Sequence, residues 1–305
     1  MKRVVLQNGD MRVALLSYGA ITQGWWHRGT PLILGYDDPQ TYRSDPNFMG
    51  AIVGRLANRV SNAAFEMDGI RYHLDANEGP NHLHGGPGGF WSRDWHLEQL
   101  SATEARLTYH SPDGEGGYPG AVDVAVTVTL GPDSLTYEME ARPDRPTPLT
   151  LAQHNYYSLG TTDGALTLHV PATHALDLTE ARLPTGTLTP VAGTPLDLTR
   201  PTALGRSGPE IDHFYVLDPA SDPAAPIATL TAASGLTLTV HSDQPGAQVY
   251  TGQGVAPPFT PFAGICLEPS GYPNAVNRAD FPSVIATPDT PSRQTLRLTL
   301  TEAAP

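Results

Sequence analysis

Hydrophobic and polar residues alternate with a period of two over much of the chain. The clearest run lies at residues 122–130, where every second position is apolar: Val122, Val124, Val126, Val128 and Leu130. Successive side chains of a β-strand point to opposite faces of its sheet, so this run predicts a strand with one face in a core. Shorter runs of the same kind predict strands at residues 13–16, 166–170, 236–240 and 296–300.

Turn-forming segments separate these runs, and no stretch of the chain shows three helical turns with caps. DGEGGYPG at residues 113–120 and GPDS at residues 131–134 are examples of such segments. The pattern therefore predicts an all-β protein, an antiparallel β-sandwich of two packed sheets. The proline-rich residues 218–226 are the best linker candidate. Strand patterns lie on both sides of them, so we expect a single domain over residues 1–305.

Composition and charge agree with this architecture and exclude several partners. The chain has 30 glycines and 30 prolines, which suits many short strands joined by tight turns. Its formal net charge of −13 opposes binding to nucleic acid or to an anionic membrane. No apolar run reaches the roughly 18 residues of a membrane span. With Cys266 as the single cysteine, we expect a cytoplasmic, unprocessed protein without disulfides.

Lysine is almost absent, and this excludes several kinds of enzyme. Lys2 is the only lysine among the 18 basic residues, and it lies at the terminus. A Schiff-base aldolase, a pyridoxal phosphate enzyme and a Walker A nucleotide site each need a placed lysine. The sequence offers none of these sites.

Three polar clusters are candidates for chemistry. His82 and His84 are two residues apart in NHLHGG, so on a strand they would share a face and could bind a metal. The lack of an acidic third ligand nearby favours hydrogen-bonding loop residues instead. His154 precedes two tyrosines, and a histidine there is either a proton-transfer group or a core residue satisfied by the backbone. Glu268 ends the apolar run 262–267, where burial would raise its pKa and make it a better base near neutral pH.

Several short motifs occur together in one order along nearly the whole chain. They are GRLANR (54–59), NHLHGG (81–86), HNYY (154–157), DH (212–213) and LE (267–268), with YGA (18–20), DGEGGYPG (113–120) and QPGAQVYTG (244–252) in support. In these motifs the chain resembles the galactose mutarotases, also called aldose 1-epimerases. Each motif alone is weakly specific, but the ordered set is highly specific.

The resemblance implies a fold, an activity and a set of roles. The fold is the galactose mutarotase-like supersandwich, and its cleft interconverts the α and β anomers of a free aldose, such as galactose or glucose, with no cofactor and no metal. Glu268 is then the general base that takes the C1 hydroxyl proton, and His154 is the acid that protonates the ring oxygen. The family's sugar-binding positions correspond to Arg55, His84, Tyr156, Asp212 and Gln248. On these roles, an ionised Glu268 would set the acid limb of the pH profile and a protonated His154 the alkaline limb.

The chain departs from the family pattern at a few positions. Pro269-Ser270 replaces the usual Thr/Ser-Gln pair, Asn274 replaces an aspartate, and Gln153 replaces an asparagine. These changes concern the sugar preference, which depends on loop geometry that motif spacing does not reveal.

Other functions compete with the mutarotase hypothesis. A carbohydrate-binding protein without turnover would be expected to lose Glu268 or His154 first, yet both are present. A metal-dependent hydrolase would use His82 and His84. A glycosidase needs two carboxylates about 5–9.5 Å apart, and Asp212 is the only carboxylate that could join Glu268 in that role.

Overall fold

The computed structural model describes residues 1–218, 222 and 224–302, and it is built almost entirely from β-strands. The linker candidate at residues 218–226 lies partly outside the described residues. Within them there is no α-helix, and five short 3₁₀ helices occur: η1 (Pro39–Ser44), η2 (Ser61–Ala63), η3 (Phe90–Ser92), η4 (Glu115–Gly117) and η5 (Ala275–Asn277). The strands are β1 (Arg3–Asn8), β2 (Met11–Leu16), β3 (Thr22–His27), β4 (Thr30–Pro31), β5 (Ile52–Val53), β6 (Arg59–Val60), β7 (Ala64–Met67), β8 (Ile70–His73), β9 (His82–Leu83), β10 (His96–Gln99), β11 (Glu104–Ser111), β12 (Val122–Leu130), β13 (Ser134–Pro143), β14 (Thr147–Pro148), β15 (Ala152–Gln153), β16 (Tyr156–Tyr157), β17 (Leu166–His169), β18 (His174–Leu178), β19 (Pro184–Pro190), β20 (Thr202–Ala203), β21 (Asp212–Val216), β22 (Ala228–Ala232), β23 (Leu236–Ser242), β24 (Gly246–Tyr250), β25 (Ile265–Ser270), β26 (Ile285–Ala286) and β27 (Ser292–Glu302).

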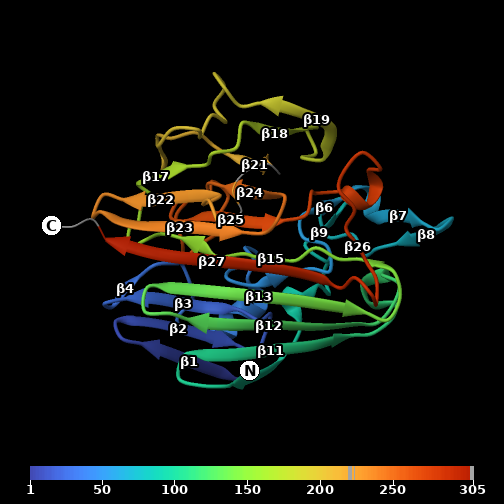
Figure 1. The fold of residues 1–305 in the computed structure, drawn as a ribbon, viewed down its shortest axis with the longest axis horizontal. Helices are drawn as coiled ribbons and strands as arrows, with labels where there is room; N and C mark the ends of the chain where they lie inside the picture. Colours follow the sequence, from blue (N-terminus) through green and yellow to red (C-terminus); the bar gives the residue numbers. More distant parts are fainter. Residues whose placement is uncertain (219–221, 223, 303–305) are drawn as a thin grey trace.

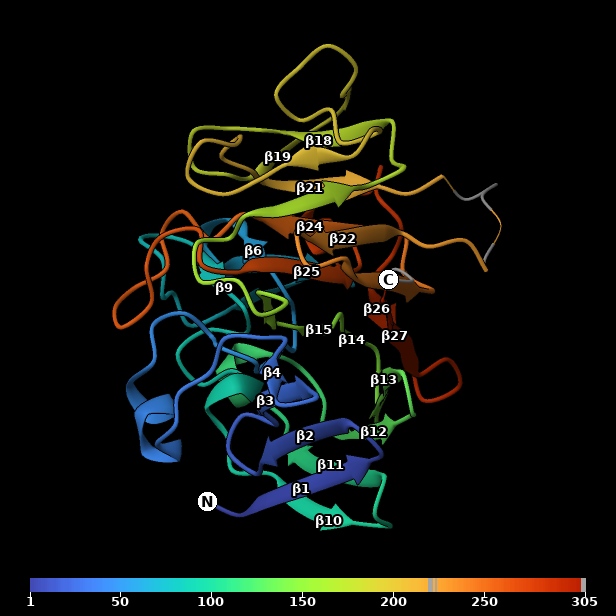
Figure 2. The ribbon, with the colours of Figure 1, turned by 90° about the vertical axis from the view of Figure 1, so that its left-hand side faces the viewer.

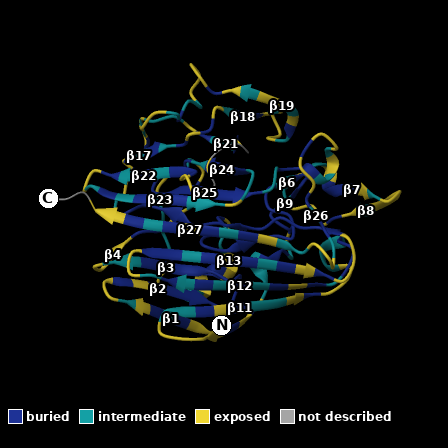
Figure 3. Ribbon diagram, viewed as in Figure 1, coloured by how far each residue is buried: buried dark blue, intermediate teal, exposed yellow. Residues whose placement is uncertain are grey.

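The largest sheet has nine strands, in the order β10-β11-β12-β13-β27-β23-β22-β17-β20. Its strands pair antiparallel, and they run across the front of the molecule in Figure 1. Along β12 the predicted apolar positions are buried and the residues between them are partly or fully exposed, as the changing colours along the strands in Figure 3 show. The period of two therefore decides which face of this sheet enters the core.

Two further sheets pack against the nine-stranded one. A four-stranded sheet, β1-β2-β3-β4, lies beside β11 and β12, and a six-stranded sheet, β16-β25-β24-β21-β18-β19, lies towards the other end of the molecule (Figure 2). One hydrophobic cluster contains side chains from all three sheets, including Trp25, Leu298 and Leu267. Its continuity supports the expectation of a single domain over residues 1–305, which remains a prediction.

The structure confirms the predicted fold class, an all-β antiparallel sandwich, but it contains three large sheets where two were expected. The shorter runs at residues 13–16, 236–240 and 296–300 lie within β2, β23 and β27, and the run at 166–170 extends one residue past β17. Among the described residues, no helix has the length and apolar character needed to cross a membrane.

Candidate functional site

One face of the six-stranded sheet carries a row of polar side chains. The antiparallel register places Gln248 of β24 opposite Glu268 of β25, and Asp212 begins the neighbouring strand β21. Asp212 and Gln248 are joined by a hydrogen bond of 2.7 Å from Gln248 Nε2 to Asp212 Oδ1. Alternate residues share a face, so Val249 and Leu267 point the other way, into the hydrophobic core. The same alternation that builds the core thus aligns Asp212, Gln248 and Glu268 above it.

His84 reaches this face from a loop that two sequence motifs hold together. Gly85 has φ of +87°, and a side chain there would collide with the Gly54 carbonyl oxygen, so only glycine allows the two motifs to approach. The Asn58 N–H donates to His84 Nδ1 at 3.1 Å. The Nδ1 lone pair is therefore occupied, and a neutral His84 carries its proton on Nε2 as a donor.

His154 lies just after β15, and backbone bonds fix its position. Its N–H donates to the Ala51 carbonyl, and its carbonyl accepts from the Gly50 N–H, each at 2.9 Å. The His154 ring lies edge to face with the His84 ring, with 5.2 Å between the ring centres. Its Nε2 atom lies 3.7 Å from Glu268 Oε2. The two predicted proton-transfer groups are therefore adjacent.

Together these side chains line a small cavity of about 190 Å³. Phe48 packs against both histidine rings, at 4.8 Å from His84 and 5.8 Å from His154. No hydrogen bond to the Glu268 carboxylate is present among the described residues, although only 3% of this residue is exposed. The lining residues are Pro46, Asn47, Phe48, Asn58, Arg59, Leu83, His84, His154, Tyr156, Arg182, Asp212, Gln248, Tyr250, Gly254 and Glu268.

Burial shifts the pKa values of the acid and base groups in opposite directions. Desolvation raises the pKa of Glu268 to about 8, and the nearby Asp212 charge raises it further while Arg59 opposes the shift. Desolvation lowers the pKa of His154 to about 4. The pKa of His84 is also held well below its usual range, by burial first and by His154 second. Each group is thus driven towards its uncharged form, and the expected rise in the pKa of Glu268 is confirmed.

Six of the seven predicted site residues line this cavity, and Arg55 does not. The Arg55 guanidinium points to the opposite side of its loop, where Nε and Nη2 donate to Ser111 Oγ at 3.0 and 2.7 Å. Its Nη1 donates to the carbonyls of Pro119 and Gly120. The expectation that Arg55 binds sugar is therefore wrong, because protein oxygens already bind all three of its nitrogen atoms.

Arg59 occupies the place expected for Arg55. It lies four residues later in the same motif and lines the cavity, while its Nε and Nη2 atoms hold both oxygens of Glu78 at 2.7 Å. The motif pointed to both arginines, but nothing in their spacing shows which one turns inward. Phe48, Tyr250 and Arg182 also line the cavity, and sequence reasoning did not single them out.

The positions that depart from the family pattern lie outside the cavity. Gln153 donates to the Gly50 carbonyl at 3.1 Å, and the Pro269 carbonyl accepts from Gln294. The Asn274 N–H donates to the Arg59 carbonyl at 2.9 Å. These residues support the loops around the site and do not face its contents.

His84, His154 and Glu268 are also the residues that could hold a metal ion. One ligand atom from each lies within 4.8 Å of the others. His82, the proposed partner of His84 in a metal site, is directed elsewhere: its Nδ1 lies 2.7 Å from the Asp75 carbonyl and its Nε2 lies 2.6 Å from the Tyr118 hydroxyl. The predicted pair His82–His84 therefore cannot form one site. Within the described part of the chain, a metal would therefore have to be held by the two histidines and the carboxylate of the cavity.

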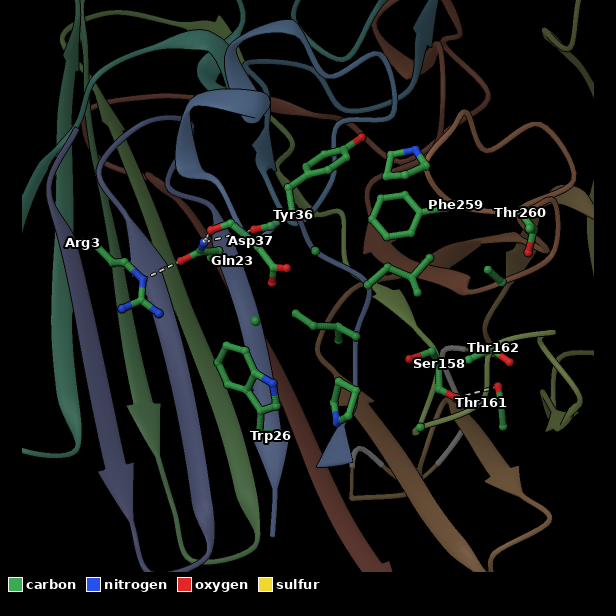
Figure 4. A pocket seen from close by; sticks show the side chains of 18 residues that line it. Arg3, Gln23, Trp26, Tyr36, Asp37, Ser158, Thr161, Thr162, Phe259 and Thr260 are labelled. Carbon is green, nitrogen blue, oxygen red and sulfur yellow. Dashed lines mark hydrogen bonds between the residues drawn. The ribbon is translucent and has the colours of Figure 1, made fainter. Parts of the chain in front are cut away.

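A wider cleft of about 600 Å³ lies elsewhere on the surface (Figure 4). Trp26, Tyr36 and Phe259 supply aromatic surface, and Ser158 and Thr161 lie across from Trp26. The described residues that line it include no histidine and no buried carboxylate. Of these two cavities, the smaller one is thus the one where buried proton-transfer groups converge.

Comparison with known proteins gives a consistent result over almost the whole length. The family profile described as Aldose 1-epimerase matches residues 2–299. The chain is 34% identical over 315 residues to galactose mutarotase of Sus scrofa, which covers 94% of this chain and 90% of that protein. It is 31% identical over 308 residues to aldose 1-epimerase of Haemophilus influenzae, covering 91% and 88%.

Solved structures show the same similarity in three dimensions. Galactose 1-epimerase of Lactobacillus acidophilus superposes with a TM-score of 0.88 at 27% identity, covering 99% of this chain and 95% of that one. A GalM/aldose epimerase homologue of C. elegans superposes with a TM-score of 0.93 at 24% identity, covering 99% of both chains. The described fold is thus shared with these proteins from end to end.

Proposed function

The chain belongs to the aldose 1-epimerase family, and from that premise we propose that Glu268 and His154 exchange protons with an aldose as its α and β anomers interconvert. The enzyme is an isomerase of the mutarotase type, and its substrate is a small sugar. The adjacency of Glu268 and His154 in a buried cavity is the observation that carries the assignment of their roles.

Anomer exchange has modest chemical requirements. A base removes the proton from O1, an acid protonates the ring oxygen, and the ring opens to the free aldehyde. Rotation about the C1–C2 bond and closure with the two roles reversed give the other anomer. We assign the base to Glu268 and the acid to His154, so no covalent adduct is needed.

The two groups share one proton at pH values between their two pKa values. Between the His154 pKa of about 4 and the Glu268 pKa of about 8, the pair holds a single proton, and burial favours its position on Glu268 before sugar binds. Transfer of that proton to His154 creates the carboxylate base and the imidazolium acid together. Both arrangements contain the same proton, so turnover requires no proton from solvent.

The remaining cavity residues bind and orient the sugar. The Nε2 proton of His84 is placed to donate to the ring-oxygen side, and Asp212 and Gln248 offer hydrogen-bonding groups to hydroxyls. Tyr156 contributes its ring as a wall, since its hydroxyl donates to the Asn47 carbonyl at 3.1 Å. Arg59 takes the binding role first assigned to Arg55. The cavity volume of about 190 Å³ suits a single sugar ring.

Polarimetry tests this proposal directly. Freshly dissolved α-galactose, α-glucose and an α-pentose are followed with and without the protein, and we expect at least one rotation to reach equilibrium faster with it. Failure to accelerate any aldose would refute the mutarotase assignment.

The histidine–carboxylate trio also favours a second candidate, a metal-dependent hydrolase that uses His84, His154 and Glu268 as ligands. Under our proposal, anomer exchange survives treatment with EDTA. An activity that EDTA abolishes and Zn²⁺ restores would support the second candidate instead.

A further inference from the structure

Arg182 stands at the tip of a hairpin beside the cavity. The hairpin joins β18 to β19 at the edge of the six-stranded sheet (Figure 1). The Arg182 N–H donates to the Thr179 carbonyl at 2.9 Å, and Arg182 adopts a left-handed conformation with φ of +58°. Because β18 runs antiparallel to β21, the turn that ends β18 lies next to Asp212, which begins β21. The Arg182 side chain extends from the turn to this strand, and its Nη1 donates to Asp212 Oδ2.

A chain of hydrogen bonds continues inward from this contact. Gln248 Nε2 donates to the other Asp212 oxygen, and Asn58 Nδ2 donates to Gln248 Oε1 at 3.0 Å. Asn58 in turn holds His84 through its backbone N–H. The Asp212 carboxylate is thus fixed from two sides, and Arg182 is the outermost member of a network that ends at a catalytic-site histidine.

We propose that Arg182 is a positioning residue for the reaction, which holds Asp212 at the mouth of the cavity and offers its remaining N–H groups to a sugar hydroxyl. This inference rests on the proposed function. Arg182 lines the cavity, about half of its side chain is exposed, and within the described residues Nη1 is the only one of its side-chain nitrogens that donates a hydrogen bond. An acceptor and a donor therefore stand side by side at the mouth, which is an arrangement suited to neighbouring sugar hydroxyls.

The charges around Glu268 give this role an electrostatic consequence. Asp212 raises the pKa of Glu268, and Arg59 lowers it but is itself paired with Glu78. The other groups that face Glu268 are uncharged near neutral pH: His84 and His154 have lowered pKa values, and Tyr156, Tyr250 and Cys266 have raised ones. Arg182 offsets the Asp212 charge, so its removal exposes Glu268 to a stronger negative field.

The test compares three variants by their kinetics and their pH profiles. In R182Q we expect KM to rise about tenfold, with kcat changed by less than about threefold. The alkaline limb of kcat/KM should move up by about half a pH unit, because Glu268 then holds its proton more tightly. R182K keeps the positive charge, so its alkaline limb should lie at the wild-type pH. Its KM should return only part of the way to the wild-type value, since lysine lacks the planar guanidinium group. E180Q, an exposed charge on the same turn, serves as the matched control and should match wild type.

The outcomes separate this inference from the proposed function. If wild-type protein accelerates no aldose, the proposed function itself fails. If wild type is active and R182Q matches E180Q in both KM and alkaline limb, Arg182 is only a surface ion pair and the inference is wrong. If the KM of R182Q rises but its alkaline limb stays at the wild-type pH, the electrostatic link from Arg182 through Asp212 to Glu268 is contradicted.

Discussion

Two buried polar clusters lie on opposite sides of the GRLANR segment, and they differ in the hydrogen bonds made by their ionisable groups. In the Arg55 cluster (Arg55, Ser111 and Glu115), all three guanidinium nitrogens donate to protein oxygens, and the Ser111 hydroxyl donates to Glu115. In the Glu268 cluster (Glu268, His154 and His84), the carboxylate has no hydrogen bond among the described residues. Yet Arg55 and Glu268 are almost equally buried, at 2% and 3% exposure.

The two clusters differ in how completely their buried groups are hydrogen-bonded, and not in how deeply those groups are buried. A buried charge whose hydrogen bonds are complete stabilises the fold around it, because every partner would be left unpaired without it. A buried acid and base with open hydrogen-bonding capacity have shifted pKa values and are ready to bind a substrate. The first cluster is thus structural, and the second is the candidate active site.

The largest expected effect comes from variants that disrupt the Glu268 cluster. Glu268→Gln and His154→Asn should each lower kcat by about 10²–10⁴-fold, because each removes a proton-transfer group. Neither should lower the thermal unfolding temperature much, since burial already holds both groups in their uncharged forms and the amide that replaces each of them is uncharged too. His110→Asn, at an exposed histidine on β11, is the control for the histidine variant. The double variant should be far less impaired than the product of the two single losses, as measured by polarimetry. A Glu268→Gln protein with near wild-type kcat would remove Glu268 from the mechanism.

A smaller effect separates the two arginines of the motif. Arg55→Met should reduce the free energy of unfolding by about 3 kcal/mol, because the carbonyls of Pro112, Pro119 and Gly120 lose their donors. The kcat and KM of the folded fraction should stay near wild type. Arg59→Met should instead raise KM about tenfold and cost little stability, as its partner Glu78 is 36% exposed. Urea unfolding measures the stability of both variants, and steady-state kinetics measures their kcat and KM. Equal losses of stability would show that both arginines are structural.

The smallest effect concerns the pH profile. The one-proton form of the Glu268–His154 pair should be the active one, so kcat/KM should fall below a pH of about 4, where both groups are protonated, and above a pH of about 8, where neither is. The structure therefore reverses the limbs expected from the sequence, since burial places Glu268 on the alkaline limb and His154 on the acid limb. The residual activity of Glu268→Gln should lack the alkaline limb. An alkaline limb that persists unchanged in Glu268→Gln would contradict this arrangement.

The sequence by itself determined the all-β class, the strands with clear alternation and most residues of the candidate site. Alternation along β12 fixes which side chains enter the core, because the period of a strand is set by local backbone geometry. The scarcity of lysine excluded whole classes of chemistry, and the ordered motifs pointed to Glu268, His154, His84, Asp212, Gln248 and Tyr156, all of which line one cavity.

Only the tertiary structure decided how these residues work. Arg55 and Arg59 are four apart in one motif, and which of them faces the cavity depends on Ser111 and Glu78, which belong to other segments. The direction of each pKa shift depends on burial among groups from several strands and loops. Arg182 carries no motif and reaches Asp212 only because β18 lies beside β21. Hydrogen-bond satisfaction, desolvation and charge are properties of neighbours in space, and a linear pattern specifies them only after the chain has folded.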